Sequence, residues 1–259
     1  MSAPEGFEVR LGLASPVALG ALPYAPTLDS VLLALLSGGE TLVGDDAKRL
    51  YEQLGEILVV ENGIPAASCL WPDEAQQTAG ITSTHPRVAS VEEVRQWASG
   101  VYGDTIVPDN PEKNRSTTAS GPFTARMHTV RAVYAGTWNW WGVGDRGRVE
   151  ELLTGTALSV GARRGSGYGL VSDVALRRSD ETAWRLLGLG PYVLGRPIPA
   201  RGLERFLAES EISHDELNAE RHCAVPLPAW PAPTWGPGPH EVYWLPMLED
   251  ADQQLEGLV

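Results

Sequence analysis

Hydrophobic and polar residues follow two different periods in the first 38 residues. Between residues 7 and 13 apolar side chains alternate with polar or small ones, which predicts a strand with one buried face. Thr27 is a good N-cap, and five apolar residues then recur at helical spacing: Leu28, Val31, Leu32, Leu35 and Leu36. This spacing predicts an amphipathic helix, which Gly38-Gly39 ends.

Similar patterns predict further elements up to residue 176. Strands are expected over 57–60 and 66–70, because Glu61-Asn62-Gly63 between them is typical of a tight turn. Another strand is expected over 124–135, and Asp145 and Gly155 mark the start and end of a second helix. With a last strand at 170–176, the order is close to the β-α-β-β-α-β pattern of a ferredoxin-like fold. The sequence therefore predicts an α+β fold.

The helical and strand periods lapse between residues 99 and 122, where Gly, Pro, Asn, Ser and Thr dominate around Lys113 and Arg115. A loop this long is functional or disordered in most compact proteins. Beyond residue 178 we expect short helices at 182–187, near 203–207 and after Ser213, and an extended Pro-rich tail. The predicted domains are a ferredoxin-like palm at 1–178, with the 99–122 insertion, and a helical and Pro/Trp-rich extension at 179–259.

Charge is distributed unevenly along the chain. The net charge of the chain is −13, but residues 126–178 hold eight arginines and only four acidic residues, a local excess of +4. An acidic body with one basic segment suits a protein that touches nucleic acid on one face. No apolar stretch is long enough to span a membrane and no signal peptide is recognised, so the expected location is the cytoplasm. The two cysteines show no metal-ligand spacing.

The most informative stretch is a glycine-rich loop between a predicted helix and a predicted strand. Four glycines in nine residues allow positive φ and a close backbone approach, and successive amides can form an anion nest. Two arginines can bind phosphate and one tyrosine can stack on a base. Neither a Walker A triplet nor a G-x-G-x-x-G fingerprint is present, so no nucleotide cofactor is predicted. The candidate RNA-binding residues are Gly161, Arg163, Arg164, Gly165, Ser166, Gly167, Tyr168 and Gly169.

The pattern Gly-x-Arg-Arg-x-x-Gly-Tyr-Gly over 161–169, between a helix and a strand, resembles the C-terminal signature of RAMP-superfamily CRISPR-associated proteins. A helix that starts with Leu28-Asp29 after an apolar strand resembles the N-terminal signature of that superfamily. The nearest resemblance is to the small, Cas-five-class subunit of type IV effector complexes. It implies a non-catalytic subunit that holds the 5′ handle of the guide RNA (crRNA) and has the 99–122 insertion as a thumb.

The resemblance also implies partners. These are the crRNA, a backbone subunit of the Cas-seven class, a large subunit and, if the complex acts on DNA, the target DNA. Arg126, His128 and Arg131 on the strand before the loop, with Lys113 and Arg115 in the insertion, extend the predicted RNA-binding set.

Two other functions remain open at this point. Relatives in the same superfamily cut guide RNA without metal, which needs a general base such as histidine and a nearby cation. His128, which lies between two arginines, is the one histidine suited to that role, so an endoribonuclease is the alternative. The third class is a small-molecule or protein-interaction module that binds no RNA.

Overall fold

The structure is a computed structural model, and it describes residues 3–19, 25–38, 45–73, 77–85, 126–162, 164–187, 191–228 and 240–247. Its described part is a mixed α+β fold with antiparallel sheets, which confirms the predicted class. The chain divides into two compact units, one of Met1–Ala79 with Ala132–Val259 and one of Gly80–Arg131.

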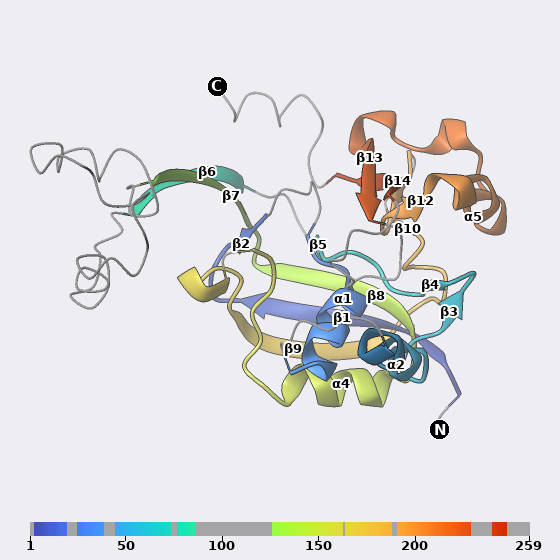
Figure 1. The fold of residues 1–259 in the computed structure, drawn as a ribbon, viewed down its shortest axis with the longest axis horizontal. Helices are drawn as coiled ribbons and strands as arrows, with labels where there is room; N and C mark the ends of the chain where they lie inside the picture. Colours follow the sequence, from blue (N-terminus) through green and yellow to red (C-terminus); the bar gives the residue numbers. More distant parts are fainter. Residues whose placement is uncertain are drawn as a thin grey trace, which may run out of the picture. The chain divides into compact units, whose positions relative to one another are not determined.

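The largest sheet has four strands that come from distant parts of the sequence. They are β1 (Glu5–Leu13), β5 (Trp71–Pro72), β8 (Thr137–Gly144) and β9 (Val171–Arg178). Their order is β5-β8-β1-β9 and every neighbouring pair is antiparallel (Figure 1). β1 is therefore central, and the strands that flank it follow it by more than 120 residues.

Helices cover one face of this sheet. They are α1 (Leu28–Leu36), α2 (Asp45–Gly55) and α4 (Arg146–Thr154) (Figure 1). Phe7, Val9 and Leu11, at alternate positions of β1, are fully buried in one core cluster with Leu32 of α1 and Leu153 of α4. Burial of each such side chain stabilises the fold by about 2 kcal/mol. The alternation predicted for 7–13 is thus the face that packs on the helices.

Both predicted helix starts are present, but they are capped differently. Asp145 caps α4 through its side chain, which accepts a hydrogen bond of 3.1 Å from the Arg148 amide, and Gly155 follows the last turn. Thr27 stands at the N-cap of α1, yet its side chain makes no capping bond. The Leu28 amide instead donates to the Ser68 carbonyl at 3.1 Å, so tertiary contact replaces the local cap.

The predicted turn at Asn62-Gly63 is confirmed, since both residues have positive φ, at 54° and 79°. The strands around it are shorter than predicted and displaced: β3 (Val60–Glu61) and β4 (Ile64–Pro65) replace 57–60 and 66–70. The 66–70 segment forms no strand because its amides bond to separate parts of the chain. Cys69 donates to Gly195 and Leu70 donates to Pro26, so no single partner strand runs beside it.

Three short helices are expected after β9; one of these predictions is wrong and two are confirmed in part. Residues 182–187 are not helical: the Asp180 carboxylate accepts from the Thr182 amide at 2.7 Å and forms a turn, which leads into β10 (Leu186–Leu187) paired with β11 (Val193–Leu194). The helix near 203–207 is α5 (Leu203–Glu209), which follows η3 (Ala200–Gly202). After Ser213 only one turn forms, η4 (His214–Glu216), followed by η5 (Ala219–Arg221).

The Pro-rich tail forms paired strands in its described part. β13 (His222–Pro228) pairs with β14 (His240–Pro246), which also pairs with β12 (Ile198–Pro199), and residues 229–239 lie outside the description. This region contributes most of a second core cluster, which also includes Ala66 and Val143 and in which the rings of Trp184 and Phe206 meet edge to face at 5.8 Å.

Another sheet has the order β2-β7-β6, from β2 (Val17–Ala18), β6 (Gln77–His85) and β7 (Arg126–Tyr134). The end of β7 pairs with β2, with Val133 opposite Val17 and Ala132 opposite Ala18. The thumb predicted at 99–122 and the residues Lys113 and Arg115 lie outside the described residues. None of the described helices has the length and apolar character that a membrane crossing requires.

Candidate nucleic-acid interface

The two ends of the glycine-rich loop are tied to the turn that follows β1. The Val160 amide donates to the Gly169 carbonyl, the Gly169 amide to the Pro16 carbonyl, and the Ala162 amide to the Ala18 carbonyl, each at 2.8 Å. These bonds close the loop at its base and attach it to the edge of β2. The loop that the sequence singled out therefore has a fixed position on the first unit.

Two glycines are required by this geometry. Gly161 has a φ of 87°, and a Cβ there would come within 2.7 Å of the Ala18 carbonyl oxygen. Gly169 has a φ of 64°, and a Cβ there would collide with the backbone of Val160. Gly165, in contrast, has open space around it. Gly161 therefore lets the base of the loop lie against β2, and Gly169 lets its two ends lie against each other.

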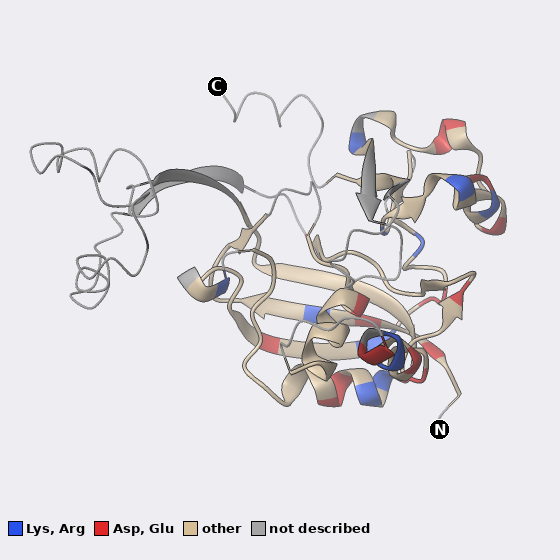
Figure 2. Cartoon of the chain, viewed as in Figure 1, with Lys and Arg blue, Asp and Glu red and all other residues tan. Residues whose placement is uncertain are grey.

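The tip of the loop presents unpaired hydrogen-bond donors. It forms one short turn, η2 (Arg164–Ser166), closed by a bond from the Gly167 amide to the Arg164 carbonyl at 3.0 Å. Arg164 is exposed on η2 and pairs with no carboxylate of the described residues. Figure 2 shows in blue and red where basic and acidic residues lie along the described ribbon. Within the same described part, the amides of Arg164 and Gly165 donate to no acceptor. A cation beside free amides is an arrangement suited to a phosphate.

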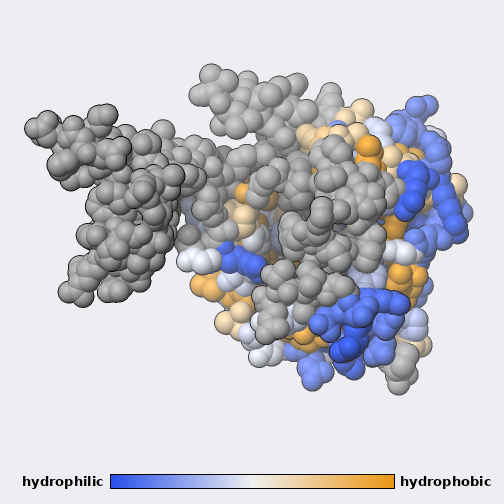
Figure 3. Space-filling view, in the orientation of Figure 1, coloured by the Kyte–Doolittle hydropathy of each residue, from blue (hydrophilic) through white to orange (hydrophobic). Residues whose placement is uncertain are grey.

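Two exposed apolar side chains, which sequence reasoning did not select, belong to the segments beside the loop. Leu170 directly follows the loop and is 46% exposed, and Tyr134 at the end of β7 is 42% exposed. Figure 3 shows apolar surface next to the loop that carries η2. Tyr168 within the loop is half-buried. Neither Tyr134 nor Leu170 stands in a recognisable motif, so exposure is the only signal for them.

The structure does not describe the side chains of several other predicted RNA-binding residues. Arg163 lies outside the described residues. Arg126, His128 and Arg131 are on β7 in the part assigned to the second unit, and their side chains are not described. The side chain of Ser166 in η2 is likewise not described. Their roles remain predictions.

The basic segment carries less free charge than its composition suggests. Arg146 and Arg178 both pair with Glu5, at 2.8 and 2.6 Å, and Arg177 pairs with Glu8 at 2.6 Å. The hydrogen bond from Arg146, and then the charge of Arg178, lower the pKa of Glu5 below its usual value. Both acids come from β1, so the fold places them against arginines more than 130 residues away. Three of the eight arginines counted between 126 and 178 are thereby paired with two carboxylates, which offset two of their three charges.

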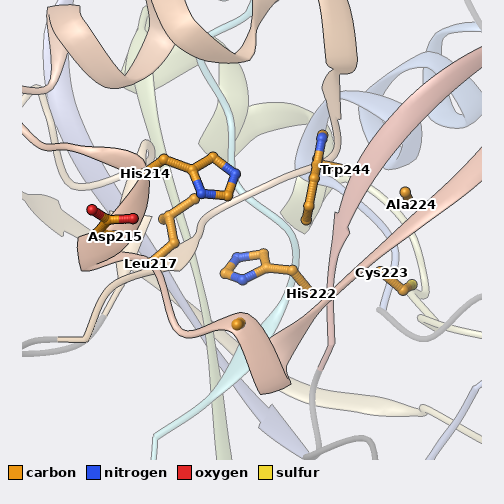
Figure 4. Close-up of a pocket in the computed structure, with 8 residues that line it drawn as sticks. His214, Asp215, Leu217, His222, Cys223, Ala224 and Trp244 are labelled. Atoms are coloured by element: carbon orange, nitrogen blue, oxygen red, sulfur yellow. The ribbon is translucent and has the colours of Figure 1, made fainter.

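A cavity of about 480 Å³ in the C-terminal part is the second candidate site (Figure 4). It is lined by His214, Asp215, Leu217, Ala219, His222, Cys223, Ala224 and Trp244. The rings of His214 and Trp244 meet edge to face at 5.4 Å. Within the described part of the chain, no three metal-ligating side chains cluster as a metal site would need.

His222 has a structural role in this cavity. Its Nδ1 donates to the Asn218 carbonyl at 2.6 Å, and its Nε2 accepts from the Leu194 amide at 3.0 Å. Burial lowers the pKa of His222, so the ring stays neutral near pH 7. Because both ring nitrogens are already bonded, His222 has none left to act as a general base.

Comparison with known proteins gives little further information. No protein-family model matches the chain, and no curated protein matches it. Among solved structures, it is similar to a chain from the crystal structure of the Csm3–Csm4 subcomplex of a type III-A CRISPR-Cas interference complex. The TM-score is 0.36 and the sequence identity 9%, over 93% of this chain and 91% of that one. A TM-score of this size does not establish a shared fold.

Proposed function

We propose that this chain is a non-catalytic RNA-binding subunit of a CRISPR ribonucleoprotein effector complex, and that its loop Gly161–Gly169 holds the 5′ handle of the crRNA. The observation that carries the proposal is the tip of the loop. Arg164 is exposed, and among the described residues it has no ionic partner and its own amide and that of Gly165 have no acceptor; the base of the loop is fixed by three backbone bonds. Preorganised donors of this kind suit a phosphate backbone.

The finer assignment is a Cas-five-class small subunit of a type IV complex, with a Cas-seven-class backbone subunit and a large subunit as partners. The strand order β5-β8-β1-β9, with α1 between β1 and β5 and α4 between β8 and β9, supports a ferredoxin-like palm over 1–178. The loop follows α4 and precedes β9, as the resemblance requires. The thumb role of 99–122 is part of the same proposal.

A salt titration of RNA binding tests the loop. Each phosphate contact that is lost lowers the slope of log K against log salt by about 0.7–0.9. Replacing both Arg163 and Arg164 by Ala should therefore weaken binding of labelled repeat RNA and reduce the slope by about one to two. Arg148→Ala is the matched control, because Arg148 is an exposed arginine on α4. Equal effects of the control and the loop variant would refute the role of the loop.

Cleavage assays test the non-catalytic part of the proposal. Purified protein is incubated with labelled repeat RNA and without divalent metal, and we expect the RNA to stay intact. Cleavage that disappears in His128→Ala would overturn this and favour a guide-processing endoribonuclease instead. Cleavage that persists in that variant would indicate a contaminating nuclease or another catalytic group. Repeating the metal-free assay after further purification distinguishes the two, because only a contaminant would be removed.

A further inference from the structure

Two of the four large apolar side chains that are exposed in the described structure belong to the segments next to the candidate RNA-binding loop. Tyr134 and Leu170 have 42% and 46% of their surface exposed, while the other two, Val60 and Val242, lie on β3 and β14. An exposed aromatic ring on a segment linked through β2 to the base of a loop that carries an exposed arginine is a combination suited to a nucleotide.

Backbone bonds fix both residues relative to the loop. Tyr134 follows Val133, which is paired with Val17 of β2, and β2 in turn bonds to the loop through Ala18 and Ala162. On the other side, the Leu170 amide donates to the hydroxyl of Ser15 at 2.8 Å. The Leu170 carbonyl accepts from the Ala14 amide at the same distance. The turn between β1 and β2 therefore links the segments of Tyr134, Leu170 and the loop within one compact unit.

We propose that Tyr134 stacks on a nucleobase of the RNA whose phosphates contact the loop, and that Leu170 provides an apolar contact to the same strand. This inference rests on the proposed function. An RNA strand that contacts Arg164 through its phosphates leaves its bases available for contact with neighbouring side chains. One sugar lies between each phosphate and its base. Aromatic stacking is tolerant of sequence because every base has a π-face.

A single-stranded RNA is favoured over a protein partner as the occupant. A stable protein interface needs hundreds of square ångströms from each partner, with a contiguous apolar centre. Among the described residues, the segments next to the loop expose two large apolar side chains, and the loop itself has an exposed arginine and two amides without an acceptor. That mixture of one ring, one aliphatic group and anion-binding donors matches the parts of a nucleotide.

The test measures affinity of the full chain for fluorescein-labelled oligouridylate and for repeat RNA. Tyr134→Leu removes the ring but keeps apolar bulk, and we expect a loss of about fivefold to a hundredfold. Tyr134→Phe should bind as the parent does. The salt slope should stay unchanged in Tyr134→Leu, because no phosphate contact is removed. Val242→Ala is the control for loss of an exposed apolar side chain elsewhere.

RNA with single abasic positions identifies the contact. If Tyr134 stacks on one base, removing that base and replacing Tyr134 by Leu abolish the same contact. The losses of affinity should then not add, and the two changes together should weaken binding little more than either alone. Full affinity in Tyr134→Leu together with weakened binding in the double Arg163/Arg164 variant would refute the inference and leave the proposed function intact. No effect of either change would refute both. A Tyr134→Leu defect in binding another effector subunit, with RNA affinity intact, would assign this surface to protein and overturn the inference.

Discussion

Two arginines of this protein, Arg196 and Arg164, have opposite environments. Arg196 is 3% exposed: it donates to the Ala67 carbonyl at 3.0 Å and to the Pro65 carbonyl, and it faces the fully buried carboxylate of Asp29 at 3.5 Å. Arg164 is exposed on η2 and has no partner among the described residues. The first joins three segments of the chain, whereas the second makes no ion pair within the described part and is exposed to an external anion.

The comparison shows that neighbouring glycines and prolines in the sequence do not reveal the role of an arginine. Arg196 lies in Gly195-Arg196-Pro197 and Arg164 in a glycine-rich loop, yet only one of them is buried. Asp29 belongs to the Leu-Asp pattern at the start of α1, which the sequence offered only as a resemblance. In the fold that aspartate is the partner of Arg196, which gives the pattern a structural reason.

The largest expected effect is the loss of stability when the buried Asp29–Arg196 pair is broken. Replacing Asp29 by Asn, or Arg196 by Met, leaves a buried charge without its partner, and this costs about 3–5 kcal/mol. Urea denaturation should show that loss in the free energy of unfolding. In the Asp29→Asn/Arg196→Met double variant no buried charge remains, so its free energy of unfolding should fall by much less than the sum of the two single changes. Full additivity would mean that the two residues do not act as a pair.

The next effect concerns the base of the loop. Gly169→Ala puts a side chain at positive φ and against the backbone of Val160, and should destabilise the protein by at least about 1–2 kcal/mol. Gly165→Ala, where space is open, should change the unfolding midpoint little. Equal midpoints for the two variants would mean that Gly169 is not held against the backbone of Val160.

A smaller effect is expected from pH at His222. Burial lowers its folded pKa below the usual value of 6.5, so the unfolded chain takes up a proton first as the pH falls. Stability should be constant above about pH 6.5 and decline below it, by at most about 1.4 kcal/mol per pH unit. Carboxylates with lowered pKa, such as Glu5, titrate below this window. His222→Gln should flatten the dependence of the free energy of unfolding on pH between pH 5 and 7. An unchanged slope would mean that another group causes this dependence.

The smallest effect on stability is expected at Arg164. Arg164→Ala removes an exposed side chain with no described partner, so the free energy of unfolding should change by less than about 0.5 kcal/mol. Its affinity for repeat RNA should nevertheless fall, with a salt slope smaller by about one. This outcome would separate Arg164 from Arg196 on both measurements. A stability loss as large as that of Arg196→Met would show that the loop arginine also has a structural partner.

Local patterns predicted those parts of the fold that depend on neighbouring residues. The alternation at 7–13, the spacing of Leu28 and Leu32, the cap at Asp145 and the turn at Asn62-Gly63 all correspond to observed elements. The helix predicted at 182–187 failed because the Asp180 side chain stabilises a competing turn. The strand predicted at 66–70 failed because its amides bond to several distant segments.

The sequence by itself determined the α+β class, the limits of α1 and α4 and the positive-φ glycines of the loop, since periodicity, capping residues and glycine conformation act over a few residues. Only the tertiary structure decided which charges remain free. Glu5 and Glu8 neutralise arginines more than 130 residues away, and Asp29 meets Arg196, because strand pairing brings distant positions within ion-pair range. The same long-range pairing of β2 with β7 links the segment of Tyr134 to the loop, a relation that no local pattern encodes.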